Sequence, residues 1–246
     1  MTEMRYTAAV RRVIQHLEST QMEAIDAAAG LVVAALRGGG LVYCAEIGHG
    51  TQGDFLNRAG GLAALQPFRY SFHVEDPTPD ARKDRPRDEP VERDLEAIRL
   101  AVRVSNLRPG DVMLVGSVSG RNRAPIELAL ACRAAGVKVI GFTSFAHTQR
   151  VESLHPSGLR LRDAVDVAID NGAPFGDAAV TIPGIDVDVL PVSGVAMDIA
   201  GWMIWERVME RMAKEGDPPT VYMSVNREGG QEYYQQAREK LNRRGY

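Results

Sequence analysis

Apolar residues follow two alternating patterns along this chain: a helical spacing and short continuous runs. In the first 37 residues they recur every three or four positions, which predicts two helices, the second opened by a capping box from Thr20 to Glu23. Short apolar runs predict five strands, at LVYCA (41–45), VMLVGS (112–117), VKVIGF (137–142), VDVAI (165–169) and TVYMSV (220–225). Further helices are predicted at 91–105, 125–135, Val195 to about Lys214 and 231–243. This alternation predicts an α/β fold, a three-layer αβα sandwich around a parallel sheet.

One segment departs from this pattern. Residues 75–94 hold 13 charged residues and four prolines, which predicts a long exposed loop. It is either a solvated insertion or a lid whose basic side chains meet a phosphate. We therefore expect one domain over 1–246, with N-terminal helices (1–37), this charged loop, and C-terminal helices and the last strand (195–246).

Composition narrows the function classes. The 246 residues are 45% hydrophobic and 25% charged with a net charge of −3, so the basic excess of a duplex nucleic-acid binder is absent. The most apolar run, near Trp202, contains Asp198 and is no membrane span. The start of the chain lacks the apolar core of a signal peptide, so we expect a cytoplasmic protein. Cys44 and Cys132 lie in apolar contexts without metal-site spacing, so we expect small core cysteines in a reducing compartment, not a metal cluster or a disulfide scaffold. We also expect no cofactor.

Two loops follow predicted strands and carry polar or glycine-rich sequence: EIGHGTQGD (46–54) and GSVSGRNRAP (116–125). Ligands of parallel α/β sheets bind beyond the carboxyl ends of the strands, where such loops lie. The first loop contains the dinucleotide-binding spacing G-x-G-x-x-G at Gly48, Gly50 and Gly53. That match is weak, because two helices precede the strand and the acids about 20 residues later lie in the charged loop.

The second loop is the more informative one. Ser117, Ser119, Gly120 and Asn122 stand between a buried strand and a helix whose first turn holds Pro125. Hydroxyls, backbone N–H groups and the positive end of a helix suit a phosphate monoester. The alternative is a serine- and glycine-rich loop that only caps the helix.

Several motifs in order resemble the sugar isomerase (SIS) domain family. They are IGHGT (47–51), NRAGGL (57–62), SVSGRN (117–122), SGRNRAPIE (119–127), the TS…H…HPSG stretch (143–158), VAIDNGAPFGDA (167–178) and SVNREGG (224–230). The resemblance runs from about residue 4 to 230 and looks closest to a bacterial subgroup with this domain. It implies a flavodoxin-like five-stranded parallel sheet and a phosphorylated sugar as ligand.

The resemblance also implies roles for single residues. Ser117, Ser119 and Asn122 would hold the phosphate, with Asn122 in place of the family's threonine. In the first loop, Gly50 stands where the family usually has serine, which leaves Gly48 and Thr51 as the contacts.

Catalytic positions follow in the same way. Asp54 lies about where several family isomerases place a catalytic glutamate. The position of a second family carboxylate falls on Ala124, and Glu127 lies three residues further on.

Aldose–ketose isomerisation needs a base near two adjacent carbons and a group that moves protons on the oxygens. Besides Asp54 and Glu127, the candidates are His49 in the first loop and His147 and His155 after the third strand. Each of these residues also has a non-catalytic alternative. His155 is followed by proline and could simply lie in a turn, and Asp54 and Glu127 could simply stabilise the N-terminus of a helix. Asn226 lies in a polar turn that could complete the site.

We therefore expect a phosphosugar isomerase that works through an enediol or enediolate. An etherase or lyase acting on a sugar phosphate is a second enzyme reading. A non-catalytic sugar-phosphate sensor is the alternative from another class, favoured by the altered carboxylates at 54 and 124. Apolar helix surface at 3–37 and 195–212 predicts a homodimer or larger homo-oligomer.

Overall fold

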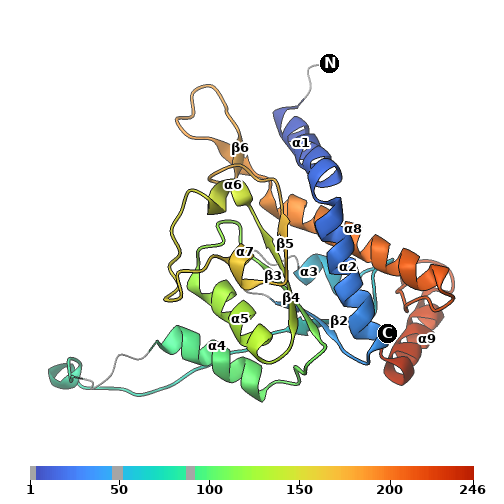
Figure 1. Ribbon diagram of the computed structural model, residues 1–246, viewed down its shortest axis with the longest axis horizontal. Coiled ribbons are helices and arrows are strands. Elements are labelled where there is room, and N and C mark those ends of the chain that lie inside the picture. Colours follow the sequence, from blue (N-terminus) through green and yellow to red (C-terminus); the bar gives the residue numbers. More distant parts are fainter. Residues whose placement is uncertain (1–3, 46–51, 87–91) are drawn as a thin grey trace.

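A five-stranded parallel sheet forms the centre of the computed structural model, which describes residues 4–45, 52–86 and 92–246 (Figure 1). Its strands lie in the order β2-β1-β3-β4-β5. They are β1 (Val42–Ala45), β2 (Leu65–Phe68), β3 (Val112–Gly116), β4 (Lys138–Thr143) and β5 (Val167–Asp170). This is the flavodoxin-like order, which confirms the predicted fold class. The strand order reverses between β1 and β3: β2 lies on one side of β1, and β3, β4 and β5 follow on the other side. A ligand crevice is therefore expected at the carboxyl ends of β1 and β3.

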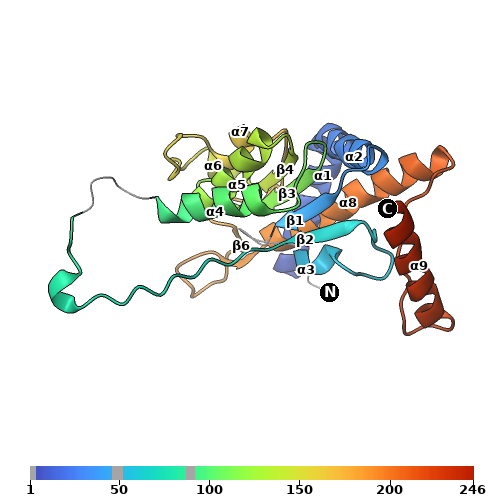
Figure 2. The same ribbon diagram turned by 90° about the horizontal axis from the view of Figure 1, so that it is seen from below.

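Helices cover both faces of the sheet, and Figure 2 shows the two layers on either side of it. One layer contains α1 (Arg5–Thr20), α2 (Met22–Arg37) and α8 (Ser193–Lys214). The other contains α4 (Arg93–Val104), α5 (Arg123–Ala134) and α7 (Leu161–Ala164). Each strand contributes side chains to both faces of the sheet, because successive side chains point in opposite directions. In β3, Leu114 packs with the first layer, and Met113 and Val115 pack with the second. All five residues of β3 are buried, as its continuous apolar run predicts.

The predicted last strand, 220–225, is wrong, and the fifth strand of the sheet is β2 instead. Val221 forms only an isolated antiparallel bridge with Leu62, and the Tyr222 N–H donates to the Gly61 carbonyl. The strand β2 has the sequence LQPF, in which Pro67 lacks an N–H. Proline is tolerated there because β2 lies at the edge of the sheet and has a strand on one side only.

The predicted capping box at the start of α2 is also wrong. Thr20 is the last residue of α1, and its hydroxyl donates back to the His16 carbonyl at 2.8 Å. Gln21 occupies the N-cap of α2 and makes no side-chain capping bond. The threonine is already bonded to the preceding turn, which is a common alternative for this residue type.

Four smaller elements complete the described chain. The helices α3 (Gln52–Phe55) and α6 (Phe145–Thr148) follow β1 and β4, and α9 (Gly230–Arg244) lies beyond α8. An antiparallel pair, β6 (Ala178–Val180) with β7 (Val189–Pro191), was not predicted and connects β5 to α8. No helix among the described residues is long and apolar enough to cross a bilayer.

Residues 70–86, here called the arm, extend away from the sheet (Figure 2). The arm carries one short 3-10 helix, η1 (Asp80–Arg82), and nearly all of its side chains are exposed. Among them, Phe72 is 63% exposed and Val74 is 58% exposed. The described part of the charged segment 75–94 is thus almost entirely exposed, and it follows directly after the exposed apolar side chains of Phe72 and Val74.

Candidate functional site

A cleft of 510 Å³ opens at the carboxyl edge of the sheet. Its walls come from three loops that follow β3, β4 and β5. The lining residues are Ser117, Val118, Ser119, Asn122, His147, Gly176 and Asp177. Three of the predicted phosphate-binding residues and one of the candidate histidines therefore lie around a single space. Distant parts of the sequence meet here because parallel strands all end at the same edge.

The loop 117–122 is held in shape by two threonines beneath it, so we call it the cradle. The Thr143 hydroxyl donates to the Val118 carbonyl at 3.1 Å, and the Thr148 hydroxyl donates to the Ser119 carbonyl at 3.0 Å. Gly120 has a φ of 63°, and a Cβ there would lie 2.8 Å from both threonine hydroxyl oxygens. Glycine is therefore required at this position for both backbone and steric reasons.

The cradle leads directly into α5, and this adds anion-binding groups. Asn122 is the N-cap of α5, yet its side chain makes no capping hydrogen bond. Ser117 is 2% exposed and lines the cleft. The N–H groups of the first turn of a helix have no intrahelical partner and carry a partial positive charge. Ser117, Ser119 and Asn122 thus line the cleft next to the N-terminus of α5.

His147 also lines the cleft, and its surroundings favour the neutral ring. The Gly176 N–H donates to its Nδ1 at 3.4 Å, which assigns the ring proton of the neutral form to Nε2. Burial lowers the pKa of His147, and the charge of Asp177 opposes that shift only in part. The ring also packs against Phe175, with centroids 4.9 Å apart. This arrangement favours an imidazole that can donate one hydrogen bond into the cleft without carrying a charge.

Asp177 lines the cleft but is already committed to the start of α8. Its Oδ1 accepts the N–H groups of Val192 at 3.2 Å and Ser193 at 2.9 Å, and its Oδ2 accepts the Ser193 hydroxyl at 2.6 Å. Its φ of 68° is in the left-handed region, which aspartate tolerates better than most residues. Asp177 thus fixes the helix α8 to the wall of the cleft.

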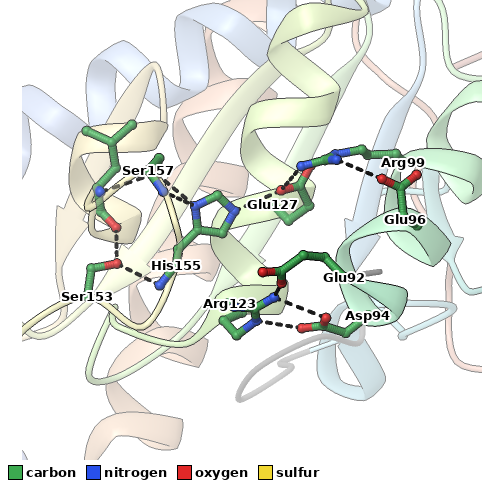
Figure 3. A network of polar contacts seen from close by, with 10 residues as sticks. Glu92, Asp94, Glu96, Arg99, Arg123, Glu127, Ser153, His155 and Ser157 are labelled. Atoms are coloured by element: carbon green, nitrogen blue, oxygen red, sulfur yellow. Dashed lines mark hydrogen bonds and ion pairs between the residues drawn. The ribbon is translucent and has the colours of Figure 1, made fainter. Parts of the chain in front are cut away.

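Two of the candidate catalytic residues, Glu127 and His155, contact each other behind the cradle (Figure 3). His155 Nε2 lies 2.8 Å from Glu127 Oε2, and Arg99 Nε donates to Glu127 Oε1 at 2.6 Å. The His155 and Glu127 side chains are only 4% and 5% exposed. Burial alone would raise the pKa of Glu127, but the hydrogen bonds from Arg99 and His155 outweigh it and lower the pKa. Neither side chain lines the cleft.

This buried network supports the cradle through the segment 150–160, here called the strap. The Leu154 N–H donates to the Arg121 carbonyl at 2.9 Å, and the Leu161 N–H, at the start of α7, donates to the Gly120 carbonyl at 2.8 Å. His155 belongs to the strap and Glu127 to α5, so their contact joins the strap to the helix that the cradle opens. The geometry suits these two residues to positioning the cradle.

Asp54 lies on the other side of the strand-order reversal, in α3. Its side chain is 54% exposed, and Arg58 Nη2 lies 3.8 Å from its Oδ1. A second carboxylate that responds to the charge of Asp54, Asp198 of α8, was not predicted as a site residue. Burial, and then the charge of Asp54, raise the pKa of Asp198 to about 6. The signal was present in the sequence as a single acid within the most apolar helical run.

The remaining predicted residues divide into two groups. Asn226 lies in an exposed turn before α9 and is not among the residues that line the cleft. Gly48, His49 and Thr51 lie outside the described residues, so their predicted roles remain predictions. Within the described ranges, no group of three or more His, Cys, Asp or Glu side chains could hold a metal ion.

Comparisons with known proteins show a family to which the chain is similar. The family model described as the SIS domain matches residues 5–144. A UPF0309 protein of Halalkalibacterium halodurans is 32% identical over 238 residues, which is 93% of each chain.

Two solved structures also align with the chain at 17% identity. The sugar isomerase domain of an RpiR transcription factor from Sphaerobacter thermophilus has a TM-score of 0.48, with 97% of this chain and 96% of that chain covered. A phosphoheptose isomerase from Neisseria gonorrhoeae has a TM-score of 0.49, with 85% and 95% covered.

Proposed function

This chain belongs to the SIS domain family, because the family model matches more than half of it, and we propose that it binds a phosphorylated sugar in the cleft at the carboxyl edge of its sheet. The observation that carries the proposal is the cradle. Ser117, Ser119 and Asn122 line the cleft at the N-terminus of α5. Such a convergence of donors binds phosphate oxygens without requiring a basic side chain.

The cradle assignment is tested by replacing Ser119 with alanine. Loss of one hydrogen bond to a charged group costs about 1.5–3 kcal/mol, so Ser119→Ala is expected to weaken sugar-phosphate binding by tenfold or more. Isothermal titration against hexose, heptose, pentose and N-acetylated hexosamine phosphates measures this effect. Ser19→Ala, an exposed serine on α1, is the control and is expected to bind like the wild type. Equal affinity of Ser119→Ala and wild type would show that the Ser119 hydroxyl does not bind the phosphate.

We further propose aldose–ketose isomerisation as the reaction. A base takes the proton from C2 of the sugar, an enediolate forms, and the proton returns at C1. Asp54 is partly exposed beside the strand-order reversal and is one of the proposed acid–base groups, with His49 the proposed second. The neutral His147 would then donate a hydrogen bond to a sugar oxygen in the cleft. Deuterium wash-in at C2, followed by NMR in heavy water, is the direct assay.

A sensor without catalytic activity is the second candidate, and one observation favours it. Position 124 is alanine, and the nearby carboxylate of Glu127 is bound by Arg99 and His155 behind the cradle. A wild-type protein that binds a sugar phosphate tightly but exchanges no deuterium with any sugar of the panel would establish the sensor. An etherase or lyase would instead release a fragment from a suitable sugar ether in the same assay.

We also propose that the chain forms a homodimer or larger homo-oligomer. The arm projects from the sheet with Phe72 and Val74 exposed, and a second copy would cover these apolar side chains. Sedimentation at micromolar concentration is expected to give at least twice the chain mass of 26.8 kDa. Phe72→Ser is expected to shift the equilibrium toward the monomer. A wild-type protein that sediments at the chain mass would contradict the proposal.

A further inference from the structure

A second pocket, of 310 Å³, lies between the arm and the start of α4, and we call it the arm pocket. Among the described residues, none lines both this pocket and the cleft. Four of the side chains that line the arm pocket are basic and one is acidic: Arg82, Lys83, Arg85 and Arg93 against Asp76. A pocket with this excess of positive charge attracts an anion.

The positive charge of the arm pocket is largely uncompensated. Lys83 pairs with Asp80. The guanidinium groups of Arg82, Arg85 and Arg93 make no ion pair or hydrogen bond with any residue that the structure describes. Like charges gathered around one space repel one another, and an anion among them replaces that repulsion with attraction. The arrangement therefore points to a negatively charged ligand.

Hydrogen bonds within the arm shape its side of the pocket. The Thr78 hydroxyl donates to the Asp76 carbonyl at 3.1 Å, and the Arg82 N–H donates to the Pro79 carbonyl at 2.8 Å. These bonds turn the chain around η1, so that side chains before and after this short helix line one space. The arm pocket thus lies where the arm is locally folded.

The body of the protein supplies the other side of the pocket through Arg93, the first residue of α4. Its neighbours Glu92 and Asp94 both pair with Arg123 (Figure 3). Arg123 Nε donates to Asp94 Oδ2 at 2.7 Å, and its Nη2 donates to Asp94 Oδ1 at 3.2 Å. The two acids beside Arg93 therefore already have a partner. Arg123 directly follows Asn122 of the cradle, so these ion pairs connect the start of α4 to the start of α5.

Chemistry, charge and size narrow the ligand. A guanidinium group offers a planar fork of N–H donors that matches phosphate oxygens. A phosphate monoester carries about −1.5 to −2 at pH 7, so the larger charge of a diphosphate group matches four basic side chains and one acid better. The chain as a whole has a net charge of −3, which disfavours a long polyanion such as a nucleic acid. The volume of 310 Å³ lies at the lower end of the range of small-molecule sites, about 300–1,000 Å³.

We propose that the arm pocket is a second anion site and that it binds a small molecule carrying a diphosphate group. The site is separate from the cradle, and it does not rest on the proposed function. Arg82 and Arg85 of the arm and Arg93 of α4 donate charge-assisted hydrogen bonds to the phosphate oxygens. The bound diphosphate thereby links the arm to the start of α4.

Calorimetric titration with inorganic pyrophosphate, at low ionic strength and without divalent cations, tests the site. Arg85→Gln is expected to weaken binding by about five- to tenfold, because it removes a charged donor from an exposed site. Arg238→Gln is the matched control, because it removes an exposed arginine of α9 outside the pocket and should bind like the wild type. Both side chains are exposed, so both variants are expected to fold, and circular dichroism checks this. Equal affinity of the two variants would overturn the proposal.

A second measurement separates the arm pocket from the cradle. Pyrophosphate is expected to bind Ser119→Ala as tightly as the wild type, because Ser119 lines the cleft and not the arm pocket. Hydrogen exchange followed by mass spectrometry then locates the anion. The amides of residues 76–86 are expected to exchange more slowly when pyrophosphate is present. Slowing confined to residues 116–125 would place the anion at the cradle and overturn the proposal.

The outcomes are distinct from those of the sugar-phosphate titration. Pyrophosphate binding at the arm pocket of a protein that binds no sugar phosphate supports this inference while the proposed function fails. Inorganic phosphate that binds as tightly as pyrophosphate overturns the diphosphate assignment. A wild type that binds neither anion at millimolar concentration overturns the site itself.

Discussion

Replacing Glu127 with alanine is expected to lower the free energy of unfolding by about 1–3 kcal/mol, since its removal leaves the buried His155 ring without its hydrogen-bond partner. Arg99 and His155 both bond to this carboxylate, and the His155 side chain is 4% exposed. Urea denaturation monitored by circular dichroism measures the change. Glu96→Ala is the matched control, because Glu96 also pairs with Arg99 but is 59% exposed and should cost less than about 1 kcal/mol.

The same difference should depend on pH with a defined sign. The pKa of Glu127 is lowered in the folded protein, so its stabilising contribution is fully present above the unfolded value of about 4.3. The contribution is lost as the pH falls through the folded pKa. The stability difference between wild type and Glu127→Ala is therefore expected to be constant near neutrality and to shrink in acid. A loss no larger than that of Glu96→Ala would show that the network does not hold the strap.

The sheet illustrates what can be derived from the sequence. The strands β1, β3, β4 and β5 were predictable because each lies in a short apolar run of the sequence. The strand β2 was not predictable, because the two central residues of its sequence LQPF are glutamine and proline, a pattern that also fits a loop. The run TVYMSV has strong strand propensity, but propensity does not choose a partner. The backbone at Gly61 pairs with it, outside the main sheet.

The site divides along the same line. The cradle was predictable because Ser117, Ser119 and Asn122 lie within six residues, between a strand and a helix that both have clear local signals. The contact of Glu127 with His155 was not, because 28 residues separate them and either residue type also fits a catalytic role. The raised pKa of Asp198 was not predictable either, because it depends on burial and on the charge of Asp54, 144 positions away in the chain. Local sequence thus finds groups that act with their neighbours in the chain, and the fold adds those that act across it.

Replacing Gly120 with alanine is expected to damage both the cradle and the fold. The backbone at Gly120 has a φ of 63°, and the new Cβ would lie 2.8 Å from the hydroxyls of Thr143 and Thr148. Those hydroxyls hold two carbonyl groups of the cradle, so they cannot move without releasing it. We expect a loss of about 1–2 kcal/mol from the backbone conformation and about 1–3 kcal/mol from overpacking. Sugar-phosphate affinity should fall at least tenfold in the protein that remains folded.

Gly158→Ala is the control that isolates the steric part of this effect. Gly158 lies in the strap with a φ of 72°, and a Cβ there would meet nothing within 4 Å. This variant shares the backbone penalty of about 1–2 kcal/mol and lacks the clash, so its sugar-phosphate affinity is expected to stay within a few-fold of the wild type. Thermal unfolding and calorimetric titration of the two variants give the comparison. If both variants lose the same stability and keep the same affinity, the threonine contacts beneath Gly120 do not shape the cradle, and the phosphate is bound elsewhere along the carboxyl edge.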